Sequence, residues 1–331
     1  MSKTITSSTD VVIIGAGISG LLCAEELRRA GQTVQLVEKG RGCGGRMATR
    51  RWAGARLDHG AQYFTVRDPR FQRYVDEWLE HGVVTEWFRQ FPEDSGSVGH
   101  PRYRGIHGMT DAAKYLARNL QIHLSERVSR ITWAGTEWEV ASESGTCFRG
   151  GQLVITAPLP QALDLLADSA VALPGEVAGA LRAIQYEKGL ATLAILDGPS
   201  GLPYPGGVKV SGGILSWMAD NQMKGISPEV SAVTLHADAA FAEAHWDAPN
   251  EERGPLMLDA AAAFLKADVV EYQCHRWGYA IAPAPWPDRF YTHPSLKLTL
   301  AGDSFGGPRV EGAALSGIAT AEHLKGGRHA T

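Results

Sequence analysis

The stretch Asp10–Gly40, DVVIIGAGISGLLCAEELRRAGQTVQLVEKG, decides the fold that we expect for this chain. Residues 10–14 form a largely apolar run, which is typical of a parallel strand covered on both faces. Apolar residues then recur at helical spacing, and Gly31 is placed to end that helix. Residues 34–37 return as a second strand. The stretch therefore predicts a βαβ unit.

A glycine pattern, G-x-G-x-x-G, joins the first strand to the helix. In this position the first glycine allows a tight turn, the second lets the backbone approach a pyrophosphate, and the third permits close packing of helix on strand. The positive end of the helix dipole favours the pyrophosphate. Glu38 ends the second strand, where a carboxylate can accept hydrogen bonds from a ribose. The pattern predicts a dinucleotide site, and the alternative is a plain βαβ unit with turn glycines.

The residues after Glu38 distinguish one dinucleotide from another. Residues 42–47 place three glycines and Arg46 in six positions, and an arginine can bind a pyrophosphate through two parallel hydrogen bonds. The stretch resembles the GG-R-hx-[ST] element of the flavin amine-oxidase superfamily, and Met47, Ala48 and Thr49 fit its last three positions. The resemblance implies FAD. The alternative is a surface loop with a solvated arginine.

The end of the chain resembles the closing motif of the same superfamily. A strand predicted over 297–301 leads to Gly302 and Asp303, and a helix is predicted over 312–324. The resemblance implies that Asp303 binds the ribityl chain and that the last helix begins at the pyrimidine side of the flavin, where its dipole would stabilise the anionic reduced form. It also implies an adenine contact from the backbone of Val128. The FAD-binding residues expected from all these motifs are Gly15, Ala16, Gly17, Ile18, Ser19, Gly20, Glu38, Lys39, Gly45, Arg46, Met47, Gly60, Ala61, Gln62, Val128, Gly302, Asp303, Glu311, Gly312 and Ala313.

Four longer stretches resemble one branch of the superfamily, the bacterial renalase-like proteins. They are residues 39–47, 57–65, 274–280 and 302–317. The resemblance extends over nearly the whole chain. It implies an FAD oxidase that takes a hydride from 2- and 6-dihydro isomers of NAD(P)H onto flavin N5, releases NAD(P)+ and is reoxidised by O2 to give hydrogen peroxide.

Few residues can be assigned to the substrate. Hydride transfer to a flavin depends on positioning and exclusion of water more than on acid–base groups. Aromatic side chains suit stacking on a nicotinamide ring, although each is also a candidate for the core. The residues expected to position the substrate are Tyr63, Trp277, Tyr279 and His59, whereas His236 and His275 are expected to be ordinary satisfied or surface histidines.

Three other functions are compatible with these motifs. A monoamine or polyamine oxidase is the first alternative, but the lysine that such enzymes place near the flavin cannot be assigned. An aromatic-ring hydroxylase would need a second dinucleotide motif, which is not found. FAD could also serve only as a structural group. We expect FAD to be noncovalent, because covalent amine oxidases carry their linking cysteine near the closing motif, where this chain has Ser304 and Phe305. Cys43 is the alternative attachment point.

The middle of the chain predicts a second domain inserted into the first. The expected fold class is α/β: a Rossmann-type, GR2-like FAD-binding domain formed by residues 1–65, 100–167 and 292–331, with an α+β substrate domain formed by 66–99 and 168–291. Helices are expected over 69–81, 109–120 and 255–266, and a strand meander over 122–155.

Composition excludes several classes of function. The 331 residues carry a formal net charge of −4 without any Lys/Arg-rich block, which disfavours nucleic acid as a partner. No window approaches the roughly 18 apolar residues of a membrane span, and the polar first ten residues do not resemble a signal peptide. The four cysteines are scattered without a CxxC pair, so we expect no metal site, no disulfide framework and a cytoplasmic location.

Overall fold

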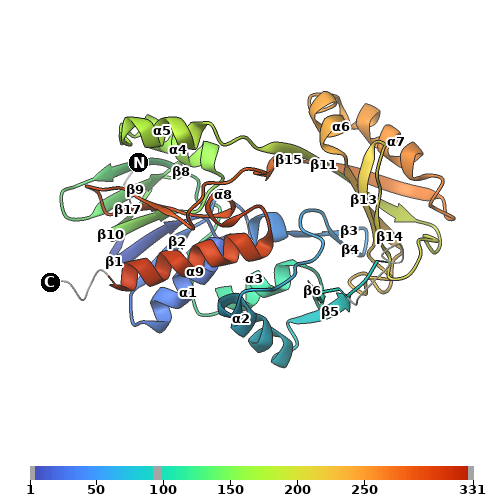
Figure 1. Cartoon of the computed structure of the whole chain (residues 1–331), viewed down its shortest axis with the longest axis horizontal. Coiled ribbons are helices and arrows are strands. Elements are labelled where there is room, and N and C mark those ends of the chain that lie inside the picture. The colour runs from blue at the N-terminus through green and yellow to red at the C-terminus, as the bar shows by residue number, and fades with distance from the viewer. Residues whose placement is uncertain (1–3, 92–98, 327–331) are drawn as a thin grey trace. The chain divides into compact units, whose positions relative to one another are not determined.

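The computed structural model describes residues 4–91 and 99–326, which divide into two compact units (Figure 1). Unit 1 lies within Met1–Gly45, Ala113–Gln185 and Ala282–Thr331, and unit 2 within Arg46–Ala112 and Tyr186–Ile281. Residues 46–65 and 100–112 fall in unit 2, although the sequence favoured the FAD-binding domain for them. The domain division expected from the sequence stays a prediction.

The described part of unit 1 is built on a sheet of eight strands in the order β16-β17-β10-β1-β2-β7, with β9 pairing with β10 and β8 with β9. The central pairs are parallel, as the apolar run at the start of the sequence predicts. The strands are β1 Thr4–Ile14, β2 Val34–Val37, β7 Gln121–His123, β8 Val128–Trp133, β9 Trp138–Ser142, β10 Thr146–Ile155, β16 Tyr291–Thr292 and β17 Leu298–Leu300.

Helices α1 (Ile18–Arg29) and α9 (Val310–Gly326) lie side by side on this sheet (Figure 1). Their close approach requires a glycine, because a Cβ on Gly317 would collide with the Ser19 carbonyl. Gly31, with φ of +79°, follows the end of α1, so the predicted βαβ unit and its stop signal are confirmed. The other helices of the unit are α4 Leu159–Asp168, α5 Gly175–Arg182 and α8 Asp303–Gly306, and α3 Thr110–Ala117 begins in unit 2.

Unit 2 contains a five-stranded antiparallel sheet in the order β12-β13-β14-β11-β15. Two separate hairpins, β3–β4 and β5–β6, belong to the same unit. The sheet strands are β11 Glu187–Leu196, β12 Gly207–Lys209, β13 Leu215–Asp220, β14 Ala232–Ala237 and β15 Val269–Ile281. The hairpin strands are β3 Thr49–Trp52, β4 Ala55–Asp58, β5 Val84–Phe88 and β6 Arg102–Gly105. The helices are α2 Pro69–Glu80, α6 Ala239–Ala244 and α7 Asn250–Ala261, with a 3-10 turn η1 at Gly45–Met47.

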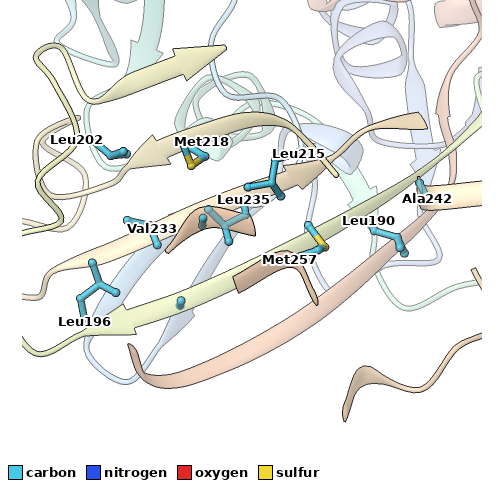
Figure 2. Packing of buried hydrophobic residues seen from close by; sticks show 11 residues of the cluster. Leu190, Leu196, Leu202, Leu215, Met218, Val233, Leu235, Ala242 and Met257 are labelled. Atoms are coloured by element: carbon cyan, nitrogen blue, oxygen red, sulfur yellow. The ribbon is translucent and has the colours of Figure 1, made fainter. Parts of the chain in front are cut away.

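The two faces of the five-stranded sheet differ because side chains alternate along each strand. One face packs against α6 and α7 through a core that includes Leu235 and Met257 (Figure 2). On the opposite face Leu193 packs against Leu57 of β4, so we call it the hairpin face. Strand register places the side chains of Trp217, His236, His275 and Trp277 on this hairpin face.

The helices expected over 69–81 and 109–120 are confirmed as α2 and α3, and the meander as β8, β9 and β10. The helix expected over 255–266 was misplaced, because α7 begins five residues earlier and carries Pro255 in its interior. Proline favours a helix start, but Glu251 and Glu252 occupy the first turn of α7, where the helix dipole stabilises acidic side chains.

Candidate functional site

The carboxyl ends of β1, β10 and β17 meet in unit 1 around Thr156. Gly15 has φ of +103°, and a Cβ there would lie 2.7 Å from Thr156 Oγ1. That hydroxyl donates to the carbonyls of Ile14 and Gly15, at 3.0 and 3.1 Å. Gly302, with φ of +123°, lies against the Thr156 carbonyl. β1 has β2 on one side and β10 on the other, and open α/β sheets bind dinucleotides at such a switch point.

The turn before α1 has room for a ligand. No side chain caps α1, so the backbone N–H groups of its first turn lack intrahelical partners. A Cβ on Gly17 would meet no atom within 4 Å, so packing within the protein does not require glycine there. Gly20 differs, because its Cβ would collide with the Gly15 carbonyl. The Ser19 hydroxyl is buried without a hydrogen-bond partner among the described residues. These features fit a bound pyrophosphate.

Glu38 is held at the same turn. Its carboxylate accepts hydrogen bonds from Ala16 N at 2.8 Å and Gly40 N at 2.6 Å, and each oxygen keeps a further lone pair that can accept from a ribose hydroxyl. The backbone N–H of Glu126 donates to the Glu38 carbonyl, which brings the segment leading to Val128 beside β2. Lys39 instead donates through Nζ to Gln161, 2.7 Å away.

The glycine-rich loop lies against the first glycine turn. Gly44 N donates to the Ala16 carbonyl at 2.8 Å, and a Cβ on Gly45 would lie 3.7 Å from Gly17 Cα. Cys43 Sγ in this loop lies 3.9 Å from the Ala113 carbonyl, and burial raises the pKa of its thiol. A protonated thiol is a poor nucleophile, which disfavours covalent attachment of a flavin here.

The closing motif is tightly packed. Gly302 N donates to Ser316 Oγ at 2.8 Å, and the same hydroxyl donates to the Arg289 carbonyl at 2.6 Å. Asp303 is buried at the start of α8. A Cβ on Gly306 would collide with the Gly312 carbonyl, so α8 lies directly against the beginning of α9. The expected residues Glu311, Gly312 and Ala313 occupy that first turn of α9.

In unit 2, the segment after β4 crosses the hairpin face of the sheet. His59 stacks on Trp277 of β15, with ring centroids 5.2 Å apart and planes at 27°, and Trp277 Nε1 donates to the His59 carbonyl at 2.8 Å. The His275 ring meets His59 edge-on at 4.7 Å. Burial, followed by the charges of His275, Arg50 and His236, lowers the pKa of His59 to about 3, so its imidazole is neutral at physiological pH.

The same segment continues over β14 and β13. Gln62 Nε2 lies 3.4 Å from Nε2 of His236, whose pKa is lowered to about 4 by burial and by the charge of Lys224. The Tyr63 ring lies 5.7 Å from that of Trp217. Residues 59–63 therefore bring three of the four expected substrate-positioning candidates, His59, Tyr63 and Trp277, onto one face of the sheet.

A buried ion pair anchors this segment. Lys224 Nζ lies 2.7 Å from Asp58 Oδ2 and 3.5 Å from Gln62 Oε1, and both charged side chains have 0% exposure. Burial lowers the pKa of Lys224, while the Asp58 carboxylate opposes that shift. Sequence reasoning missed Lys224, as it missed Thr156. Thr156 had only a weak signal, its position directly after a buried strand, and Lys224 had none.

Arg46 is bound to the end of β15 within unit 2. Its Nη1 donates to the Tyr279 carbonyl at 3.0 Å, and its own carbonyl accepts from Ala61 N at 2.9 Å. A Cβ on Gly60 would collide with the Arg46 carbonyl. The Met47 side chain is buried. The Tyr279 ring packs edge-on against Tyr186 at 5.6 Å, so Tyr279 is the fourth candidate at this end of the sheet. The pyrophosphate role expected for Arg46 stays a prediction.

The described residues carry no group of three or more His, Cys, Asp and Glu side chains arranged to hold a metal ion. None of the helices within residues 4–91 and 99–326 combines the length and apolar character needed to cross a membrane.

Comparisons with known proteins agree with this geometry. The NAD(P)-binding Rossmann-like domain family matches residues 13–78, and the flavin containing amine oxidoreductase family matches residues 84–325. Renalase of Mus musculus is 25% identical over 348 residues, which cover 95% of this chain and 98% of the mouse protein. Polyamine oxidase 1 of Oryza sativa subsp. japonica is 35% identical over 99 residues, 29% of this chain and 16% of that protein. The solved structure of putrescine oxidase bound to putrescine superposes with a TM-score of 0.73 at 15% identity, covering 97% of this chain and 99% of that one, which shows a shared fold.

Proposed function

Because the chain belongs to the family of flavin-containing amine oxidoreductases and has FAD as its cofactor, we propose that its substrates are the 2- and 6-dihydro isomers of NAD(P)H. The similarity to mouse renalase extends over nearly the full length of both chains, whereas the similarity to rice polyamine oxidase is confined to 99 residues. The full-length relative therefore supports the renalase-like branch over the amine-oxidising one.

The observation that carries the proposal is the charge of the hairpin face. The charge of Arg50 on β3 acts on His59, and Arg50 has no ion-pair partner among the described residues. The Asp58 carboxylate, directly before His59, is already bound to Lys224. His59 is neutral, because burial lowers its pKa to about 3. A face with an unpaired guanidinium favours an anion such as a dinucleotide. It disfavours a cationic amine, whose recognition needs negative charge.

The aromatic cluster formed by Tyr63, Trp87, Phe88, Phe91 and Trp217 is the feature that resembles an amine-binding cage. Cations of the chain itself already lie over several of these rings. Arg102 lies 4.4 Å from the centroid of Phe91, Lys209 lies 4.0 Å from the same ring, and Lys224 lies 4.8 Å from that of Trp87. A substrate ammonium would have to displace these cations, which disfavours the amine-oxidase alternative.

For a 2- or 6-dihydro isomer of NAD(P)H, the proposed reaction balances as NAD(P)H isomer + O2 + H+ → NAD(P)+ + H2O2. Bound FAD would supply the hydride acceptor at N5 and the two-electron route to O2. The chain has three tasks: to hold the cofactor at the turns of unit 1, to orient the dihydronicotinamide ring and to exclude water. No proton must leave the donor carbon, so a neutral His59 and the absence of an assigned base agree with this chemistry.

Orientation of the ring is the task that we assign to Trp277, Tyr279, Tyr63 and His59. Trp277 is fixed by the hydrogen bond from its indole to the His59 carbonyl and by stacking on the His59 ring. A Cβ on Gly189 of the adjacent strand would lie 3.6 Å from Trp277 Cβ, so the smallest residue borders the indole. We call the rigidly held Trp277 indole the aromatic plate. Such a ring can hold a flat substrate in one orientation.

Anaerobic stopped-flow mixing tests the proposal. The oxidised holoenzyme is mixed separately with 2- and 6-dihydro NAD(P)H, with ordinary 4-dihydro NADH, and with spermidine, putrescine and benzylamine. We expect the two isomers to bleach the flavin at least tenfold faster than the other compounds, and air to restore it with one peroxide per turnover. Rapid bleaching by an amine without a response to the isomers would establish the amine-oxidase alternative.

The cellular setting belongs to the same proposal. All four cysteines are free, and Cys23 and Cys147 are buried. Free thiols agree with a reducing cytoplasm. We propose a cytoplasmic enzyme with noncovalent FAD, whose partners are a small dinucleotide and O2 rather than nucleic acid or a membrane.

A further inference from the structure

Arg50, His59 and His275 form a nitrogen-rich group on the hairpin face of unit 2. Arg50 lies opposite Leu57 in the β3–β4 pair, so both side chains point to the same side of that hairpin. Leu57 packs against the sheet, and the Arg50 side chain is therefore directed toward the sheet as well. His275 lies on this face, opposite Ala191, and its ring is 4.7 Å from that of His59.

Two nitrogen atoms in this group have no hydrogen-bond partner. Arg50 Nε and His59 Nδ1 are shielded from solvent and have no hydrogen-bond partner among the residues that the structure describes. The His59 residue as a whole has only 6% exposure. Most buried polar groups in proteins have a partner, and leaving one without a partner is unfavourable. Since an arginine in this position also lacks a carboxylate, the group is suited to an anion.

We propose that Arg50, with His59 and His275, binds a phosphate group of the dinucleotide substrate, an inference that rests on the proposed function. The guanidinium fork matches two phosphate oxygens, and the two imidazoles supply further N–H donors. Trp277 touches both histidines, with its ring centroid 4.4 Å from that of His275. The phosphate site and the aromatic plate for the nicotinamide ring are therefore neighbours on one sheet face.

Adjacent residues of β3 provide a matched pair of variants. Arg50→Gln and Arg51→Gln each remove one positive charge, but Arg51 is exposed and its side chain points to the other side of the strand. Each variant is assayed with 2-dihydro NADH and with 2-dihydronicotinamide riboside, which has the same ring and no phosphate. We expect Arg50→Gln to raise the KM for the dinucleotide by about 10- to 100-fold, as loss of a charge-assisted hydrogen bond implies. We expect kcat to be unchanged, and the riboside to react equally well with both variants and wild type.

A binding measurement keeps this inference separate from the proposed function. Titration calorimetry of the oxidised holoenzyme with inorganic pyrophosphate should show binding to wild type and Arg51→Gln and at least tenfold weaker binding to Arg50→Gln. If no dihydro isomer reduces the wild-type flavin, the proposed function fails while the titration still decides the anion site.

The inference is overturned by an unchanged KM and pyrophosphate affinity in Arg50→Gln, or by equal losses with riboside and dinucleotide. Loss of FAD from Arg50→Gln would also overturn it, because the anion would then be the cofactor. If Arg50→Gln does not fold, His275→Gln takes its place.

Discussion

Lys224 and Asp58 form an ion pair 2.7 Å long in which both side chains are completely shielded from solvent. The carboxylate is further bound through Oδ1 to Thr49 Oγ1 at 2.6 Å and to Met109 N at 2.9 Å. These bonds join β3, β4 and the residue before α3 to Lys224. Because Asp58 directly precedes His59, the pair also determines where the segment over the hairpin face begins.

The first prediction concerns this pair. Lys224→Met should destabilise the protein by about 3–5 kcal/mol, because it leaves a buried carboxylate without its counter-charge. The double variant Asp58→Asn/Lys224→Met should recover part of that loss, since asparagine keeps the oxygen that accepts from Thr49 and Met109 and carries no charge. Denaturant unfolding at a fixed excess of FAD measures both. Equal stability of wild type and Lys224→Met would show that the ion pair contributes nothing.

The second prediction concerns cofactor retention. Gly17→Val should fold but lose most of its FAD, because the added side chain enters open space beside the α1 N-terminus rather than protein atoms. Gly179→Val is the matched control, since a Cβ at Gly179 also meets nothing within 4 Å but lies on α5. The ratio of flavin to protein absorbance gives the result, and circular dichroism checks the fold. A full complement of FAD in Gly17→Val would refute the pyrophosphate assignment.

The third prediction is that FAD is noncovalent. Burial raises the pKa of the Cys43 thiol, so the cysteine of the glycine-rich loop is poorly activated for attack on a flavin. Acid or heat denaturation followed by centrifugation should leave all yellow colour in the supernatant. Colour that stays with the precipitate in wild type but not in Cys43→Ser would identify Cys43 as the attachment point.

These elements also show why some parts of the site follow from sequence and others do not. The turn Gly15–Gly20 and Glu38 are close in sequence, and their positions follow from local backbone rules that the structure obeys. The partner of Asp58 is 166 residues away. No local pattern distinguishes Lys224 from other lysines, because its burial arises from packing between β4 and the residues after β13. The sequence predicted an ordinary satisfied or surface histidine at His275 for the same reason, because it is strand pairing that brings His275 to His59.

The fourth prediction concerns stability at low pH. His236 and His59 have pKa values lowered to about 4 and about 3 in the folded protein, mainly by burial, against about 6.5 when unfolded. Between pH 4 and 6.5 the unfolded state therefore binds more protons, and stability should rise with pH across this window and level off above it. Melting temperatures across this range measure the slope. His236→Gln should flatten it, because it removes one of the two buried imidazoles. Identical slopes in wild type and His236→Gln would contradict the assigned cause.

The last prediction tests the aromatic plate. The dihydro isomers differ from NADH only in which ring carbon carries the extra hydrogen, so discrimination requires C2 or C6, rather than C4, to lie within about 3–3.5 Å of flavin N5. Trp277 is held by His59 through stacking and a hydrogen bond, which suits it to fix the ring in one orientation. Trp277→Ala should therefore slow anaerobic flavin reduction by the 2- and 6-dihydro isomers by at least about tenfold while FAD stays bound, as expected when a group that positions the substrate is lost.

Trp246→Ala is the control, because Trp246 packs beside Gly278 and Arg276 on the opposite face of β15. Tyr279→Ala should show a similar but smaller loss, since its ring packs edge-on against Tyr186, whereas Trp277 is held by both stacking and a hydrogen bond. Wild-type reduction rates in Trp277→Ala would remove the indole from the substrate site, and equal losses in Trp246→Ala would mean that the effect comes from the sheet as a whole.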